Sequence, residues 1–146
     1  MSKRFTLAEA QSLIPAVERL LRDAITLKSE YQEAERAMQA FQERVMLMGG
    51  MVMNLERAIN LRSRREAAAG CLRTAIEQVQ GFGCVVKDLD SGLIDFPTVF
   101  RGDDVYLCWK LGETAIAFWH GVEEGFRGRK PIDEEFREHH HGDPTQ

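Results

Sequence analysis

The chain has 146 residues, of which 44% are hydrophobic and 29% are charged, as expected for one domain with one main core. Its formal net charge of -4 gives no support to nucleic-acid binding, and no run of roughly 18 apolar residues predicts a membrane span. The start, MSKRFTLAEA, lacks the apolar core of a signal peptide, so we expect a cytoplasmic protein. Three cysteines without a Cys-x-x-Cys pair predict buried, reduced thiols.

The first expected element is a helix that begins after Thr6. Thr6 and Glu9 have the spacing of a capping box, in which each side chain bonds the other residue's backbone amide. Pro15 follows soon after, and a proline inside a helix loses a backbone hydrogen bond and crowds the preceding turn. We therefore expect a kink or break between Ala10 and Pro15, with the first turns packed on a C-terminal sheet.

An apolar series with steps of four and three predicts helices of coiled-coil type through the first half of the chain. The series is Leu13, Val17, Leu20, Ala24, Leu27, Tyr31, Ala34, Met38, Phe41, Val45, Met48, Val52, Leu55 and Ile59.

The series crosses Gly49 and Gly50, and two glycines inside a helix cost about 2 kcal/mol relative to alanine. A turn at this point predicts an antiparallel hairpin with helices over residues 7–47 and 51–80, and the alternative is a single rod. Charge favours the hairpin: residues 6–48 hold five Lys or Arg against seven Asp or Glu, whereas residues 51–80 hold five Arg against three Glu. Each exposed ion pair still contributes little.

The predicted tip of the hairpin, residues 45–53, is almost wholly apolar and contains Met46, Met48, Met51 and Met53. Such residues lie far from the core of a long hairpin and need another surface, and methionine adapts to varied partners. The main interpretation is a homo-oligomer contact. A different protein partner, or a tip that folds back on its own chain, are the alternatives.

Beyond residue 80 the apolar pattern changes to alternation, which predicts short strands. The expected strands cover residues 84–89, 93–100, 105–111 and 115–120, with turns at Ser91-Gly92 and Arg101-Gly102-Asp103-Asp104. Pro97 predicts a sheet edge or a bulge, because proline donates no ladder hydrogen bond. Short neighbouring strands predict an antiparallel meander.

The expected fold class is therefore α+β: a long antiparallel, coiled-coil-like helical hairpin followed by a small antiparallel meander. One domain is expected over residues 1–132, made of the hairpin (6–80), the sheet (83–120) and a basic loop (121–132). The acidic segment 133–146, with His139-His140-His141, predicts a short frayed helix and then a flexible tail.

Several short motifs together resemble a small bacterial family known only as the domain of unknown function number twenty-two-oh-three. They are Phe5-Thr6-Leu7-Ala8-Glu9-Ala10, Leu13-Ile14-Pro15, Val86-Lys87-Asp88, Gly92-Leu93-Ile94-Asp95-Phe96-Pro97, Leu107-Cys108-Trp109, Gly112-Glu113, Trp119-His120 and Gly125-Phe126-Arg127-Gly128-Arg129-Lys130-Pro131-Ile132. The resemblance covers residues 4–132. It implies a helical N-terminal part and a β-rich C-terminal part, and it carries no activity.

A divalent metal site requires three or more ligands in one place. The candidates by residue type are Asp88, Asp90, Asp95, Cys108, Glu113 and His120. The preferred set is Asp95, Glu113 and His120, because the last two flank a short strand that Asp95 can approach across the sheet. Such ligands suit zinc, manganese or iron. The alternative is a surface carboxylate and a Trp-His pair at the sheet edge.

Two further sites are weaker hypotheses. Asp88 and Asp95 are a possible catalytic carboxylate pair across the first turn, or structural acids that cap turn amides. Arg127, Arg129 and Lys130 lie in a glycine-containing loop that predicts anion binding. In the alternative, Arg129 pairs with Asp88 or Asp95 and holds the C-terminal part down.

These patterns favour a non-enzymatic interaction or scaffold protein that self-associates through its hairpin, without nucleic-acid or membrane partners. The alternative is a small metal-binding protein or metal-dependent enzyme with its site on the C-terminal sheet.

Overall fold

The computed structural model describes residues 3–48 and 54–144, which form two compact units. Residues Arg22–Ala75 are one unit, and Met1–Leu21 together with Ile76–Gln146 are the other. The architecture is α+β, as the sequence predicts. No helix within the described ranges is long and apolar enough to cross a membrane.

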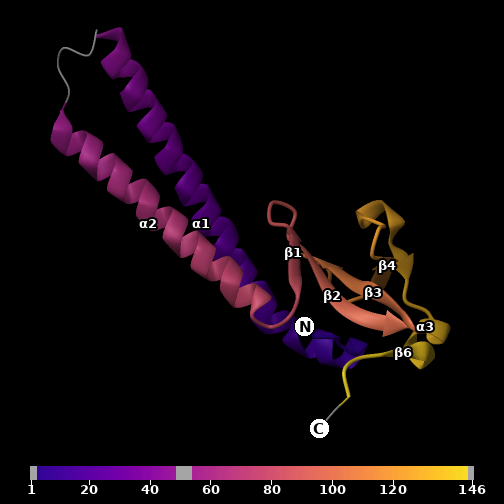
Figure 1. Cartoon of the computed structure of the whole chain (residues 1–146). Coiled ribbons are helices and arrows are strands. Elements are labelled where there is room, and N and C mark those ends of the chain that lie inside the picture. The colour runs from indigo at the N-terminus through magenta and orange to yellow at the C-terminus, as the bar shows by residue number, and fades with distance from the viewer. Residues whose placement is uncertain (1–2, 49–53, 145–146) are drawn as a thin grey trace. The chain divides into compact units, whose positions relative to one another are not determined.

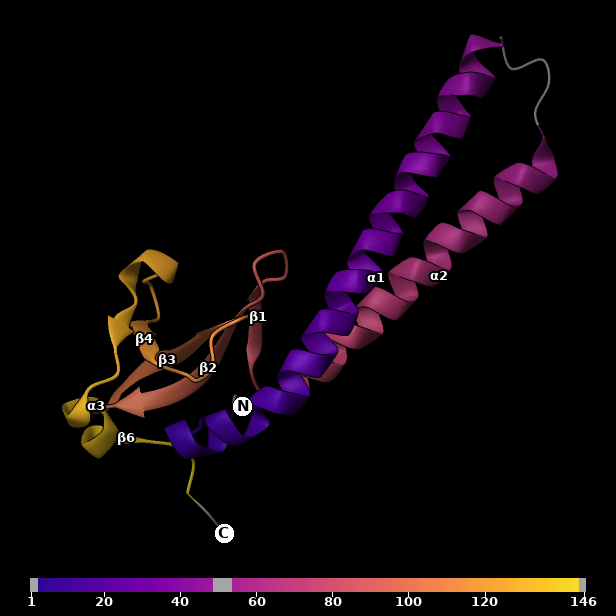
Figure 2. The same ribbon diagram turned by 180° about the vertical axis from the view of Figure 1, so that it is seen from behind.

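The unit Arg22–Ala75 is an antiparallel pair of helices. Helix α1 covers Leu7–Leu47 and helix α2 covers Leu55–Gln80, and the two run side by side in this unit (Figures 1 and 2). Arg65 of α2 reaches Glu35 of α1, with Nη1 and Oε1 3.0 Å apart. The hairpin is confirmed and the single rod is wrong. The predicted turn at Gly49-Gly50 lies outside the described residues.

The two helices pack through small and medium apolar residues. The buried ones in this unit are Ala24, Ala34, Met38, Leu61 and Ala75. Asn54 caps α2, because its side-chain oxygen accepts a hydrogen bond from the amide of Arg57 at 3.0 Å. Helix α2 therefore begins at Leu55, after an Asn cap, rather than at the expected residue 51.

The capping box at the start of α1 is confirmed. The amide of Thr6 donates to Glu9 Oε1 at 2.9 Å, and the amide of Glu9 donates to Thr6 Oγ1 at 3.1 Å. Of the kink or break expected between Ala10 and Pro15, the break is wrong, because α1 continues through Pro15 as one helix, and the kink stays a prediction. Pro15 is exposed, so the one backbone bond that it removes leaves a carbonyl on the solvent side, where water can satisfy it.

The other unit holds a sheet whose described strands pair antiparallel throughout. The strands are β1 (Val85–Asp88), β2 (Leu93–Phe100), β3 (Asp103–Lys110), β4 (Phe118–Gly121), β5 (Lys130–Pro131) and β6 (His140–His141). They lie in the order β1-β2-β3-β4-β5, with β6 beside β2. The meander is confirmed, with two short strands added and the fourth strand beginning at Phe118 rather than Ala115.

The turn between β2 and β3 has two residues, Arg101 and Gly102, with φ of 51° and 84°. Both angles are left-handed, as the tight hairpin turns that match strand twist require. Pro97 lies on the part of β2 between the stretches paired with β1 and β6. There the amide of Phe5 donates to the Pro97 carbonyl at 2.7 Å. Because β2 lies between β1 and β3, the edge strand expected from Pro97 is wrong, although Pro97 itself pairs with neither β1 nor β6.

One face of the sheet is aromatic and carries the two chain ends. The rings of Phe5 and Phe96 meet edge to face, with centroids 5.4 Å apart. The start of α1 adds a bond from the amide of Ile116 to Gln11 Oε1 at 2.8 Å. The first turns of α1 therefore pack on the sheet, as expected.

The segment after Asp133 contains the short helix that the sequence predicts, and this helix packs on the sheet rather than fraying. Asp133 caps helix α3 (Glu134–His139), and the fully buried Phe136 stacks on Phe100 and Trp119 with centroids 4.8 and 5.0 Å away. The amide of Leu7 then donates to His140 Nε2 at 2.9 Å. The burial of this ring and these hydrogen bonds offset the conformational entropy that the segment loses when it is ordered.

We expect Phe136→Ala to lower the free energy of unfolding by about 3 kcal/mol, because it removes a fully buried aromatic ring. Urea denaturation followed by circular dichroism measures the change. The control is Glu138→Ala, an exposed neighbour in the same helix. Equal stability of the two variants would mean that the segment does not pack.

Candidate functional site

The face of the sheet opposite Phe96 holds a cluster of buried polar side chains. Asp95 on β2 is directly opposite Cys108 on β3, and Tyr106, two residues before Cys108, is opposite His120 on β4. Alternation along strands therefore places Asp95, Cys108 and His120 on one face. Asp95 and Cys108 are fully buried, and the side chain of His120 is 3% exposed.

The centre of the cluster is the pair of Asp95 and His120. His120 Nε2 lies 3.0 Å from both carboxylate oxygens of Asp95. His120 Nδ1 lies 2.8 Å from the carbonyl oxygen of Gly121, which only accepts, so Nδ1 carries a proton. Nε2 must then share a proton or another cation with the carboxylate, because a bare nitrogen facing two anionic oxygens is unfavourable.

Cys108 completes the cluster. One potential ligand atom from each of Asp95, Cys108 and His120 lies within 4.8 Å of the other two. Burial, and after it the charge of Asp95, raises the pKa of the Cys108 thiol to about 12, although Arg129 opposes the shift. With no cation bound, Cys108 is therefore a protonated thiol at neutral pH.

This arrangement is unlike a cysteine protease-type triad. Such a triad places the histidine between the thiol and the carboxylate, with one ring nitrogen for each. In this protein Asp95 takes Nε2 and the Gly121 carbonyl takes Nδ1, so no ring nitrogen is left to remove the thiol proton. The raised pKa of Cys108 also opposes a nucleophilic role.

Glu113, the third ligand expected from sequence, does not join the cluster. Its Oε1 accepts hydrogen bonds from Arg129 Nη2 at 2.6 Å and from the amide of Lys110 at 2.7 Å. The carboxylate caps the turn after β3 and anchors the arginine. The structure therefore brings Asp95 and His120 together as expected, with Cys108 rather than Glu113 as the third group.

Arg129 is held by aromatic rings as well as by Glu113. Its guanidinium lies 4.1 Å from the centroid of Phe118 and 4.8 Å from that of Phe126, and Nη2 also lies 3.3 Å from the Cys108 carbonyl. Arginine pairing with an acid is confirmed, but that acid is neither Asp88 nor Asp95.

The expected anion site in the basic loop is not assembled. Lys130 Nζ pairs with Glu124 at 2.6 Å, and Arg129 pairs with Glu113. Arg127 remains exposed in the short 3-10 helix η1 (Phe126–Gly128). Two of the three cations that the hypothesis requires are therefore already neutralised.

Asp88 acts as a turn cap. It accepts hydrogen bonds from Ser91 Oγ at 2.7 Å and from the amide of Asp90 at 3.2 Å. In the ladder Asp88 is opposite Leu93, and Asp95 is opposite Val85. The two acids are therefore not directly opposite in the ladder, and Asp88 caps turn groups in the way that the structural alternative describes.

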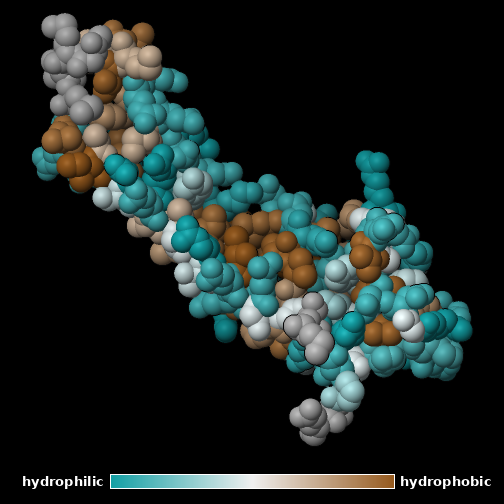
Figure 3. Space-filling view, in the orientation of Figure 1, coloured by the Kyte–Doolittle hydropathy of each residue, from teal (hydrophilic) through white to brown (hydrophobic). Residues whose placement is uncertain are grey.

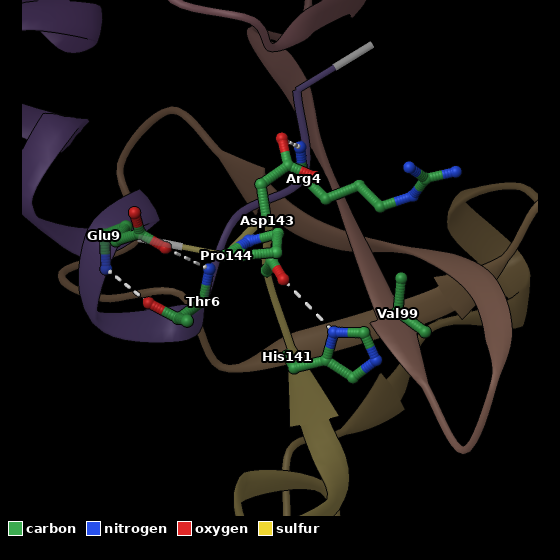
Figure 4. A pocket seen from close by; sticks show the side chains of 8 residues that line it. Arg4, Thr6, Glu9, Val99, His141, Asp143 and Pro144 are labelled. Carbon is green, nitrogen blue, oxygen red and sulfur yellow. Dashed lines mark hydrogen bonds between the residues drawn. The ribbon is translucent and has the colours of Figure 1, made fainter. Parts of the chain in front are cut away.

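A pocket of about 830 Å³ lies elsewhere in the same unit, where the two chain ends meet (Figure 4). Thr6 and Glu9, which line it, bond each other in the capping box. Arg4 and Asp143 exchange hydrogen bonds through the Arg4 backbone, both at 3.0 Å. Because these polar groups are already paired, the pocket is a weaker candidate than the buried cluster.

A family model for an uncharacterised conserved protein, DUF2203, matches residues 3–132. The chain belongs to this family. No curated protein and no solved structure was found to match it. The DUF2203 match includes Asp95, Cys108 and His120, whereas α3 and β6 lie beyond its end.

Cys108 is not in the ligand set preferred from the sequence, because the sequence does not give the pairing register of the strands. The signal that identifies it is alternation combined with register: a cysteine directly opposite a buried aspartate shares its face. The Gly121 carbonyl, which fixes the ring of His120, is a backbone group and leaves no sequence signal.

We expect Cys71 alone of the three thiols to react with a disulfide reagent in dilute native protein at pH 8. The expected burial is wrong for Cys71, which is exposed, and right for Cys84 and Cys108. Burial raises the pKa values of the latter two thiols to about 11 and about 12. Counting released thiolate before and after denaturation measures this, with Cys71→Ser as the control. Rapid native reaction of a second thiol would contradict the burial of the cluster or of Cys84.

The raised pKa values of Cys84 and Cys108 also make the free energy of unfolding depend on pH. Between the ordinary thiol range and pH 11–12, the unfolded chain ionises these thiols while the folded chain keeps them protonated. The two thiols therefore lower the free energy of unfolding as pH rises through this window, and have no such effect at neutral pH.

Proposed function

We propose that the protein binds a divalent transition metal through Asp95, Cys108 and His120. The observation that carries the proposal is the convergence of these three side chains, one from each of three adjacent strands, in a buried position. A carboxylate, a thiol and an imidazole are each common metal ligands, and buried polar groups of this kind are paired or coordinate metals.

The orientation of His120 supports the proposal. A metal-binding histidine usually donates its other ring N–H to a carbonyl or carboxylate, which fixes the tautomer. The Nδ1–H of His120 donates to the Gly121 carbonyl, so Nε2, which faces Asp95, is the ring nitrogen left to hold a metal ion in place of the shared proton.

Asp95 and His120 would need to move only slightly to bind a zinc ion together. Two ligand atoms about 2.0–2.1 Å from a tetrahedral zinc lie about 3.3 Å apart. Nε2 and each Asp95 oxygen are 3.0 Å apart, so a few tenths of an ångström suffice. The Cys108 sulfur would need to move further, because the three ligand atoms are separated by up to 4.8 Å.

The ligand set favours zinc or ferrous iron. A thiolate ligand selects softer ions, whereas magnesium and calcium prefer sites made of oxygen alone. Three protein ligands leave a fourth position for water or another molecule. The proposal is for metal binding, and the geometry supports no particular reaction.

We expect the untagged protein to bind about one zinc ion per chain, measured by calorimetry and by mass spectrometry of the dialysed protein. His120→Ala should abolish binding, and Glu113→Gln, which alters the acid outside the cluster, should retain it. Because binding displaces the thiol proton of Cys108, affinity should rise with pH.

Cobalt substitution tests the thiolate separately, since a cobalt–sulfur bond gives a near-ultraviolet charge-transfer band that Cys108→Ser should remove. Circular dichroism shows whether each variant remains folded. A folded wild-type protein that binds no zinc, iron or cobalt would leave the cluster as a proton-linked structural pair, and the proposal would be wrong.

A second function, self-association through the helical hairpin, is supported by apolar side chains that this unit leaves exposed. Hydrophobic side chains gather at the end of the hairpin, where α1 ends and α2 begins (Figure 3). The exposed ones described there are Met46, Leu47, Met48, Leu55 and Ile59, with Leu47 88% and Met46 80% exposed. Large exposed apolar groups of this kind mark interaction surfaces.

On this view the protein is a cytoplasmic bacterial scaffold that forms a homo-oligomer with coiled-coil-like helical contacts. Its three free cysteines suit a reducing compartment. Met51 and Met53, the other members of the methionine surface expected from sequence, lie outside the described residues.

We expect sedimentation equilibrium at micromolar concentration to give a mass at least twice the 16.6 kDa of one chain. The exposed apolar groups of the hairpin provide the driving force. A single species of monomer mass across this range would contradict self-association, without bearing on the metal site.

A further inference from the structure

The hairpin unit Arg22–Ala75 has a lateral groove in addition to its apolar end. The groove has a volume of about 440 Å³ and is lined by Leu27 and Glu30 of α1 and by Arg64, Ala67, Ala68 and Cys71 of α2. Its lining combines apolar or weakly polar groups with one charge from each helix. The small side chains of α2 allow another helix to approach closely.

The two charges that border the groove have no partner within the described part of the chain. Glu30 and Arg64 are both exposed, and neither takes part in an ion pair there. The neighbouring charges of α2 do have partners: Arg62 pairs with Glu66, and Arg65 pairs with Glu35. A free acid on one helix and a free base on the other make the groove self-complementary.

We infer that the groove is the surface on which a second copy of this chain packs. A two-fold axis that exchanges the two rims places Glu30 of each copy opposite Arg64 of the other, so two ion pairs form at once. Helices that pack along their sides also bury more area than an end-to-end contact, and a stable interface needs about 800 Å² from each partner. The inference rests on the proposed self-association and assigns its location.

Charge reversal tests the inference on exposed residues, whose substitution leaves the packing of the hairpin in place. Glu30→Arg puts two arginines at each contact, and Arg64→Glu puts two glutamates there. We expect each variant alone to self-associate about tenfold or more weakly than the wild type, measured by analytical ultracentrifugation.

An equimolar mixture of the two variants is the decisive sample. In a mixed dimer each arginine at position 30 or 64 of one copy faces a glutamate of the other, so association should return to near the wild-type level. A contact within one copy could not produce this rescue. The control is Glu33→Arg, which reverses an exposed acid of α1 outside the groove lining.

Cys71 gives an independent readout, because it is exposed in one copy and lines the groove. Its alkylation should slow as wild-type concentration rises, and should stay fast in Glu30→Arg at the same concentrations. Dimers that ignore both reversals but dissociate on Leu47→Lys would move the interface to the hairpin end and overturn the inference. A monomeric wild type would overturn both the inference and the self-association on which it rests.

Discussion

A fully buried carboxylate is the constraint on which the sheet depends. Asp95 lies in the middle of the central strand pair, where an unpaired charge would cost several kcal/mol. His120 meets both of its oxygens, and the ring is in turn fixed by the Gly121 carbonyl. The position of β4 against β3 is therefore set by hydrogen-bonding requirements as much as by apolar packing.

The two faces of the sheet differ in composition and in what packs on them. The aromatic face holds the chain ends: Phe5 before α1 and Phe136 in α3 both pack on it, and His140 accepts a bond from the first amide of α1. The opposite face buries the polar cluster, with Arg129 and its aromatic neighbours beside Cys108. Aromatic burial stabilises the first face, and the second combines burial with the groups that we propose as metal ligands.

Much of the fold follows from local patterns in the sequence. The capping box at Thr6 and the helical hairpin each depend on patterns among residues close together in the chain, so they could be predicted. The strand β4 was placed too early because Glu113 and its neighbours form a turn stabilised by Lys110 and Arg129, and this pairing joins distant residues. The folding of the last segment depends on Phe136 finding Phe100 and Trp119, which no local pattern specifies.

The candidate site was predictable only in part, for the same reason. Residue type identified Asp95 and His120, and spacing suggested Glu113. Only the strand register shows that Cys108 lies beside Asp95 and that Glu113 is bonded elsewhere. In the basic loop, sequence indicated three cations but not the acids Glu113 and Glu124 that neutralise two of them.

The register of β2 against β3 has a consequence for folding fidelity. A slip of one residue would send Cys108 to the aromatic face and bring Leu107 or Trp109 beside Asp95. The carboxylate would then be buried against apolar side chains, and the sheet would lose far more than one contact. The cluster therefore destabilises mispaired sheets relative to the native one. It favours the correct alignment of β2 and β3 whether or not an ion occupies it.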